Sequence, residues 1–274
     1  MGCNRRTTEF DDGNCLNQGM EHFLKHKKIA LRLFILMVVV FFLNQCSSEN
    51  TTFVSIADTN QAPSPQPQPV SKKVSYIALG DSYTIGQSVC VTCRFPEQLK
   101  KNLESSIPNL SVDLKIIAQT GWTTSNLIQT IREQQPTNDY KLVTLLIGVN
   151  NQYQNKEFSI YEREFPQLAQ TAIVLAKGDK NNVIVVSIPD YAYTPFGQQF
   201  GSPTKTSTEI DRYNTFAKSY CDTNGITFID ITDITRQGLK EPNLVATDGL
   251  HPSEKAYSLF VERITPKASV IVQK

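Results

Sequence analysis

The sequence predicts a three-layer α/β/α sandwich around a five-stranded parallel sheet, a flavodoxin-like arrangement. After Lys73, apolar runs of strand length alternate with amphipathic stretches, and such β-α alternation produces a parallel sheet covered by helices. Most of these runs are continuously apolar rather than alternating, which is typical of strands buried on both faces. These two observations predict one α/β domain over residues 74–274.

The predicted elements of this domain follow one another in a regular order. The strands are expected at residues 74–79, 112–118, 142–147, 183–188 and 226–231. The helices are expected at residues 96–103, 124–134, 160–177, 208–223 and 252–263. The helix over 208–223 places its aromatic residues on one face. Gly225 is expected to end that helix, because glycine is common just after a helix C-terminus.

Residues 1–46 are typical of an export leader. A basic stretch precedes an uninterrupted apolar run from Leu33 to Leu43, which is shorter than the roughly 18 to 20 residues of a membrane-spanning helix. We expect Cys46 to be the first mature residue, acylated as in bacterial lipoproteins, although Gln45 stands where a small residue is usual. An uncleaved signal anchor is the alternative, and translation could begin at Met1 or Met20.

Residues 47–73 are expected to form a linker. They contain the proline-rich segment APSPQPQPV, which favours an extended, semi-rigid spacer that packs no core. A leader followed by a spacer predicts an exported protein that is anchored to the membrane, in the periplasm or at the cell surface.

Charge and histidine content narrow the classes of function. The chain has 27 basic and 26 acidic residues and a net charge of +1, so we expect no nucleic-acid partner, because nucleic-acid binding needs clustered basic residues. Of the three histidines, only His251 lies in the predicted domain. That rules out a multi-histidine metal site there. We expect no cofactor, no metal and a monomer.

Polar and glycine residues follow the ends of the predicted strands. Ligands of open parallel sheets bind beyond the carboxyl ends of the strands. In chain order, the segments expected there are Gly80-Asp81-Ser82, Gln119-Thr120-Gly121, Gly148-Val149-Asn150 and, after a loop, Asp248-Gly249-Leu250-His251. The sequence therefore predicts that these four segments meet at one edge of the sheet.

Ser82, His251 and Asp248 have the side-chain chemistry of nucleophilic catalysis. A serine hydroxyl needs a base to take its proton, and imidazole is the usual base near neutral pH. Asp248 precedes His251 by three residues, a spacing that brings the two close across a turn, where the carboxylate can orient the imidazole. We expect Gly249 to give the turn its freedom and Pro252 to take the first position of the last helix.

An attacked acyl carbonyl becomes an oxyanion that needs fixed hydrogen-bond donors. The candidates are the backbone N–H groups of Ser82 and Gly121 and the side-chain amide of Asn150. Structural interpretations remain open for each residue: Ser82 as a turn serine, Gly121 as a turn glycine before an N-capping Thr123, and Asp248 as a helix cap.

The four blocks resemble, in order, those of the Ser-Gly-Asn-His (SGNH) hydrolases, also called GDSL esterases or lipases. The resemblance covers roughly residues 74–265 and rests on GDS at 80–82, Gly121, GVN at 148–150 and DGLHP at 248–252. It implies that Ser82 is the nucleophile, that Gly121 and Asn150 are oxyanion donors, and that His251 is the base oriented by Asp248. Tyr83 and Asn151 depart from the usual leucine and aspartate and are expected to alter the cleft rather than the chemistry.

Cys90 and Cys93 form a C-V-T-C pair soon after Ser82. In an exported protein a small disulfide loop is the favoured interpretation. A zinc site would need further ligands that the domain lacks, and a redox-active pair would need a thioredoxin-like context. Cys221 is expected to be buried.

These observations predict a serine esterase that hydrolyses carboxylic (acyl or acetyl) esters of small molecules, glycans or lipids through an acyl-enzyme on Ser82. Two alternatives remain at this point. The chain could be a surface-displayed binding protein on the same scaffold, or it could transfer the acyl group to a glycan instead of water.

Overall fold

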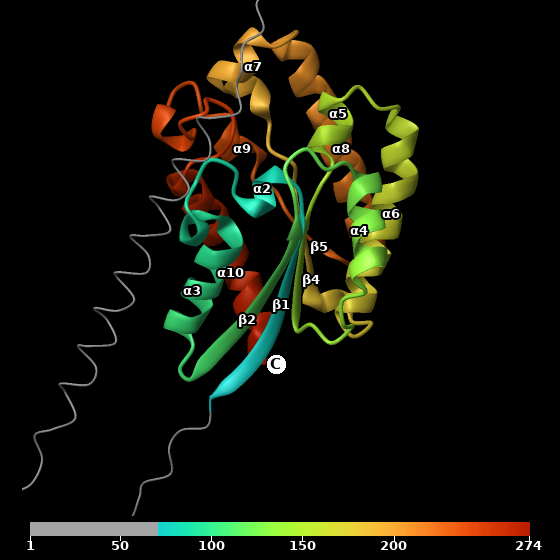
Figure 1. The fold of residues 1–274 in the computed structure, drawn as a ribbon, viewed down its shortest axis with the longest axis vertical. Coiled ribbons are helices and arrows are strands. Elements are labelled where there is room, and N and C mark those ends of the chain that lie inside the picture. Colours follow the sequence, from blue (N-terminus) through green and yellow to red (C-terminus); the bar gives the residue numbers. More distant parts are fainter. Residues whose placement is uncertain (1–70) are drawn as a thin grey trace, which may run out of the picture. The chain divides into compact units, whose positions relative to one another are not determined.

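The computed structural model describes residues 71–274. In this part of the chain, five parallel strands form one sheet in the order β2-β1-β3-β4-β5 (Figure 1). The strands are β1 (Lys72–Gly80), β2 (Leu110–Ala118), β3 (Leu142–Leu146), β4 (Val183–Val186) and β5 (Thr227–Ile229). The predicted α/β class and the parallel five-stranded sheet are confirmed.

Helices cover both faces of this sheet. Figure 1 shows α3 and α10 on one side and α4, α6 and α8 on the other, which makes three layers. The long helices are α3 (Phe95–Ser106), α4 (Thr124–Gln134), α6 (Phe158–Leu175), α8 (Pro203–Asn224) and α10 (Glu254–Gln273). The short ones are α2 (Ser82–Ile85), α5 (Val149–Tyr153), α7 (Pro195–Gln199) and α9 (Thr232–Thr235), and the 3₁₀ turns are η1 (Val91–Cys93), η2 (Lys180–Asn182), η3 (Tyr191–Tyr193) and η4 (Pro242–Leu244).

The core lies between the sheet and its two helical layers. Every residue of β3 and β4 is buried, as continuous apolar strands in the middle of a covered sheet should be. The edge strand β2 is only partly buried along its length. Polar groups inside the sheet are paired: the hydroxyls of Tyr76 and Thr144 share a buried hydrogen bond of 2.9 Å, as buried polar groups require.

The strand register aligns the carboxyl ends that carry the candidate residues. Gly80 at the end of β1 pairs with Ala118 of β2 and with Leu146 of β3. The segments that follow these three strands therefore leave the sheet along the same edge. That edge is marked in Figure 1 by α2 after β1 and α5 after β3.

Most predicted elements lie within a few residues of the observed ones, and α4 has the predicted bounds. Gly225 ends α8 with a φ of 67°, as expected. The expectation that Pro252 opens the last helix is wrong. Pro252 instead forms a bridge with Val245, and α10 starts at Glu254 with the Ser253 side chain as its N-cap, because a serine hydroxyl satisfies the first free N–H groups of a helix.

β1 begins at Lys72, two residues before the expected start of the domain at 74. The expected leader, Cys46 and nearly all of the linker lie outside the described residues. Among residues 71–274, no helix combines the length and the apolarity needed to cross a membrane.

Candidate active site

Ser82 stands at the carboxyl end of β1, where the strand turns directly into α2. Asp81 caps this short helix, because its side chain accepts a hydrogen bond of 3.0 Å from the backbone N–H of Tyr83. Gly86 ends the helix in a left-handed conformation. The tight strand-to-helix turn places Ser82 at the sheet edge, where it is 4% exposed and lines a cavity.

Asp248 and His251 form a locally built pair. The Nδ1 atom of His251 lies 2.6 Å from Oδ2 of Asp248, and Oδ1 of Asp248 accepts hydrogen bonds from the backbone N–H groups of Leu250 and His251 at 2.9 and 3.0 Å. Gly249 between them has a φ of 72°, which glycine adopts at little cost. The turn therefore holds the carboxylate against the imidazole through contacts within four residues of sequence.

The environment of Asp248 favours its ionised form. Burial acts to raise the pKa of Asp248, but hydrogen bonds from the Ser88 hydroxyl, the His251 ring and two backbone N–H groups outweigh burial and lower the pKa to about 2. Donors to a carboxylate stabilise its charged state. Asp248 is thus a charged acceptor at neutral pH, as a residue that orients an imidazole should be.

One cavity brings the candidate residues together. Its volume is about 190 Å³ and its surface is mainly apolar. All of the predicted site residues line it except Asp248, which stands behind His251. The lining residues are Ser82, Tyr83, Thr120, Gly121, Val149, Asn150, Tyr153, Tyr191, Leu250 and His251.

Gly121 lies in a loop after β2 that hydrogen bonds from other elements hold in place. The amide of Asn150 on α5 donates to the carbonyl of Trp122 at 3.0 Å, and Gln154 donates to the carbonyl of Gly121 at 3.0 Å. Gly121 has a φ of 83°, a backbone conformation that other residues rarely adopt. Because a side-chain amide carries two hydrogens, Asn150 keeps one for a ligand while the other fixes the loop.

Two residues near this loop have structural roles. Thr123 caps α4 in a capping box with Asn126, as one interpretation of this segment expected. Asn151 is fully buried, accepts from the N–H of Thr124 and donates to the Thr124 hydroxyl at 2.9 and 2.7 Å. The residue that departs from the usual family pattern therefore ties α5 to α4.

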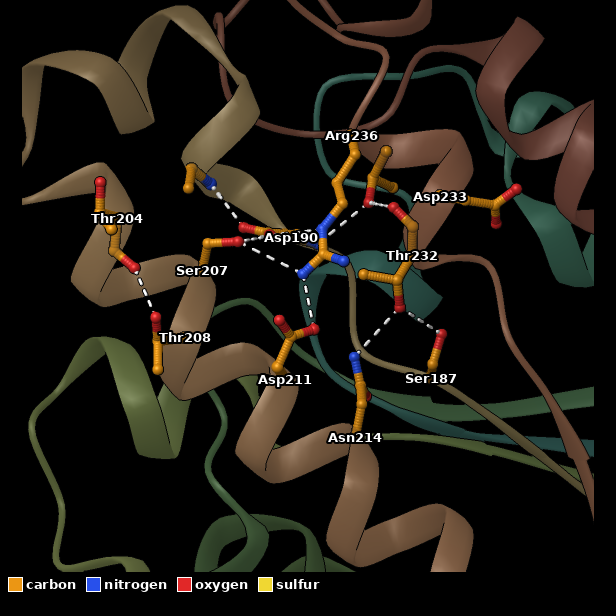
Figure 2. Close-up of polar contacts among 12 residues, drawn as sticks. Ser187, Asp190, Thr204, Ser207, Thr208, Asp211, Asn214, Thr232, Asp233 and Arg236 are labelled. Carbon is orange, nitrogen blue, oxygen red and sulfur yellow. Dashed lines mark hydrogen bonds and ion pairs between the residues drawn. The ribbon is translucent and has the colours of Figure 1, made fainter.

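Tyr191 forms another wall of the cavity, in the η3 turn after β4. Figure 2 shows the polar contacts that hold this turn: Asp190, which is fully buried, accepts from Arg236 at 2.9 Å and from Ser207 at 2.6 Å. Arg236 also pairs with Asp211 of α8 at 2.6 Å. These charge-assisted bonds fasten the wall to α8 and α9.

Tyr83 packs against the catalytic histidine candidate. Its ring centroid lies 5.3 Å from that of His251, and burial, with the charge of Asp81 as a smaller cause, raises the pKa of Tyr83 well above its usual range. Tyr83 is thus a neutral aromatic support for the imidazole, at the position where a leucine is usual.

The segment after α2 contains one link that the sequence predicted and one contact that it did not reveal. Cys90 and Cys93 are joined by a disulfide, the favoured interpretation, and Cys221 is buried with a free thiol. The Ser88 hydroxyl donates to Oδ2 of Asp248 at 2.6 Å across 160 residues of sequence. No pattern distinguishes this serine from other loop serines, so only the structure identifies it.

Within residues 71–274, no cluster of three or more His, Cys, Asp or Glu side chains could hold a metal ion.

Ser82 and His251 line one apolar cavity at the carboxyl edge of a parallel sheet, and Asp248 pairs with the histidine. With this fold, the arrangement is typical of carboxylic ester hydrolases. A model of the GDSL-like Lipase/Acylhydrolase family matches residues 78–259. The chain belongs to this family, and the matched region includes Ser82, Gly121, Asn150, Asp248 and His251.

Solved structures share the fold at low sequence identity. An acetyl xylan esterase variant from Geobacillus stearothermophilus superposes with a TM-score of 0.54 and 17% identity, over 73% of this chain and 96% of that chain. A lipase/acylhydrolase from Enterococcus faecalis gives 0.54 and 18%, over 72% and 96%. A G-D-S-L family member from Veillonella parvula gives 0.52 and 19%, over 71% and 97%. A comparison with curated proteins finds no match.

Asp81, beside the serine, is a fully buried carboxyl whose Oδ2 atom has no hydrogen-bond partner among residues 71–274. Burial raises the pKa of Asp81 to about 7, although the hydrogen bond from Tyr83 N–H acts to lower it. Because the pKa of Asp81 is higher in the folded than in the unfolded state, the folded state binds a proton more tightly at this carboxyl. The contribution of this protonation to the free energy of unfolding is full below about pH 4 and is lost as pH rises through 7.

Replacing Asp81 with asparagine should remove this pH dependence, since the amide keeps an acceptor for Tyr83 N–H and carries no charge. As the pH rises from 5 to 8, the free energy of unfolding of the wild type should fall by about 2 to 3 kcal/mol more than that of Asp81→Asn. Urea unfolding at several pH values measures this difference. Asp113→Asn, at an exposed carboxyl of β2, controls for loss of one charge, and parallel curves for wild type and Asp81→Asn would contradict the expectation.

Proposed function

We propose that the protein is a serine esterase that hydrolyses carboxylic esters through an acyl-enzyme on Ser82. The observation that carries the proposal is that Ser82 and His251 line one cavity while His251 is hydrogen-bonded to Asp248. A serine nucleophile needs this arrangement of a base and a group that orients the base.

In the proposed mechanism, His251 takes the proton of the Ser82 hydroxyl as the oxygen attacks the ester carbonyl. Asp248 holds the ring so that Nε2 faces the reaction and stabilises the imidazolium that forms. The protonated ring then delivers the proton to the leaving alcohol, and the acyl group remains on Ser82. Water, deprotonated by His251, attacks the acyl-enzyme and releases the acid.

The tetrahedral oxyanion in both steps needs donors that are fixed before the reaction. We assign this role to the backbone N–H groups of Ser82 and Gly121 and to the free amide hydrogen of Asn150. Neither backbone N–H donates to a backbone carbonyl in the described structure. The hydrogen bonds from Asn150 and Gln154 to the Gly121 loop keep its donor in position.

The small volume and apolar surface of the cavity favour ester substrates with small, apolar acyl groups. Its volume of about 190 Å³ is below the roughly 300 to 1,000 Å³ of pockets that enclose drug-sized ligands. One protein of similar fold is described as an acetyl xylan esterase, and acetyl esters are accordingly the first substrates to test here.

We also propose that the enzyme is exported and tethered to a membrane through Cys46 or an uncleaved leader. The basic and apolar leader and the proline-rich spacer in the sequence support this. The intact mass of the mature protein tests it, since a lipid on Cys46 and a retained leader give different masses.

Covalent labelling tests the proposed function directly. A fluorophosphonate should modify wild-type protein with one phosphonyl group per chain, and peptide mass mapping should place that group on Ser82. Preincubation with a slowly hydrolysed acetyl ester should slow labelling, because the acyl-enzyme occupies the same oxygen. Labelling at another serine, or no labelling of folded protein that hydrolyses no ester, would reject the proposal.

The same preparations separate hydrolysis from acyl transfer. Product analysis with an added glycan acceptor should show free acid as the main product, as expected of a hydrolase. Acetylated glycan as the main product would instead identify a transferase.

A further inference from the structure

Ser88 lies close to the catalytic pair but far from it in sequence. It belongs to the segment 86–94 that connects α2 to α3, and its hydroxyl donates to Oδ2 of Asp248 at 2.6 Å. The same oxygen accepts the hydrogen bond from the His251 ring, also at 2.6 Å. Two donors from opposite ends of the domain therefore converge on one carboxylate oxygen.

The two oxygens of Asp248 divide their partners evenly. Oδ1 accepts from the backbone N–H groups of Leu250 and His251, and Oδ2 accepts from Ser88 and the His251 ring. A carboxylate with two donors on each oxygen has little freedom to rotate. Within residues 71–274, Ser88 and the His251 ring are the side chains that donate to Oδ2.

The backbone at Ser88 adopts a left-handed conformation. Its φ is 66°, which costs free energy in a residue other than glycine and persists only where the surroundings hold it. The Cys90–Cys93 disulfide closes the chain two residues later, and Gln98 of α3 donates to the carbonyl of Cys93 at 2.5 Å. These links brace the segment that carries Ser88.

The same segment also contacts Thr120, a residue that lines the cavity. The side-chain oxygen of Gln87 accepts a hydrogen bond of 2.7 Å from the hydroxyl of Thr120, the residue before Gly121. Neighbouring residues thus touch the Asp248 carboxylate and the loop of the oxyanion donor.

We propose that Ser88 is a positioning residue of the active site, one that acts through Asp248 to hold the His251 ring in its working orientation. This inference rests on the proposed function of Ser82 and His251. Ser88 touches neither the substrate nor the reacting atoms, and the disulfide-closed segment 86–94 presents its hydroxyl to the carboxylate.

Two substitutions test this role and separate it from a structural one. Ser88→Ala removes the hydroxyl and keeps the strained backbone, whereas Ser88→Gly removes the hydroxyl and relieves the strain. Both should lower kcat by about tenfold with little change in KM, the size expected for a lost hydrogen bond to a charged group. Ser88→Asn, which tolerates the backbone conformation and restores a donor, should recover much of the loss.

The pH profile of kcat/KM supplies a readout that stability alone would not move. The Ser88 hydroxyl helps to stabilise the charge of the Asp248 carboxylate. Without this donor the carboxylate should attract the imidazolium of His251 more strongly, so the activity should fall at a higher pH on acidification. The phenols of Tyr83 and Tyr257 also interact with the charge of Asp248. Burial raises the pKa of both well above the usual range, so they stay neutral throughout this range.

The outcomes distinguish this inference from the proposed function. If wild-type protein is labelled at Ser82, and both Ser88→Ala and Ser88→Gly keep the wild-type kcat and acid limb, the positioning role is wrong and the proposed function stands. A loss in Ser88→Ala that Ser88→Gly fully restores would assign the effect to backbone strain and overturn the role as well. Ser105→Ala, at an exposed serine of α3, is the matched control.

Discussion

Ser82→Ala should lower kcat for an aryl acetate ester by about 10⁴- to 10⁶-fold, because the acyl group then has no oxygen to bond to. Fluorophosphonate labelling should disappear with it. The cavity and its other donors remain, so a small residual rate above that of water is expected. Stopped assays at high enzyme concentration, with the melting temperature as a check on folding, measure this effect.

His251→Ala should cause a loss of similar size, and the double variant should be little worse than either single one. The serine and the base act as a unit, so removing one already abolishes the contribution of the other. Additive losses in the double variant would show that Ser82 and His251 do not share a proton and would contradict the mechanism. Ser125→Ala, whose hydroxyl contacts Glu164 away from the cavity, is a serine control.

Asn150→Ala should lower kcat by about 10²- to 10³-fold and leave KM nearly unchanged. A donor to the oxyanion is worth roughly 2.7 to 4 kcal/mol in the transition state and much less in the ground state. The affinity for a phosphonate that mimics the tetrahedral state should fall along with kcat, whereas affinity for a substrate ester should not.

Gln154→Ala provides the matched control for this prediction. Gln154 holds the same loop through the carbonyl of Gly121, but we assign it no contact with the oxyanion. Its loss should therefore cost far less than the loss of Asn150. Equal losses in the two variants would mean that Asn150 acts only by holding the loop through Trp122, and would remove it from the oxyanion site.

The strands and most helices could be predicted because their signals are local. A continuous apolar run such as Leu142–Leu146 or Val183–Val186 predicts a strand that is buried on both faces of a covered parallel sheet. Both strands are fully buried in the structure. The start of the last helix was mispredicted because two local signals competed there. Proline is favoured at a first helical position, but the Ser253 hydroxyl one residue later caps the helix instead.

The main candidate residues could be proposed from sequence for a related reason. Asp248 and His251 are three residues apart, so a single turn builds their hydrogen bond. Ser82, Gly121 and Asn150 each follow a strand, and parallel strands deliver their carboxyl ends to one edge. No local sequence signal identifies Ser88, because its partner Asp248 lies 160 residues away and contacts over that distance depend on how whole elements pack.

The fold class, the functional edge of the sheet and the candidate serine, histidine and aspartate could all be read from residue order, because strand periodicity and short spacings are local features. Three features became visible only in the folded chain: the volume and apolar lining of the cavity, the Asp190–Arg236 contacts behind Tyr191, and the hydrogen bond from Ser88 to Asp248. Those features arise where segments distant along the chain pack together. The free energy of such packing depends on both segments at once, so neither segment alone predicts it.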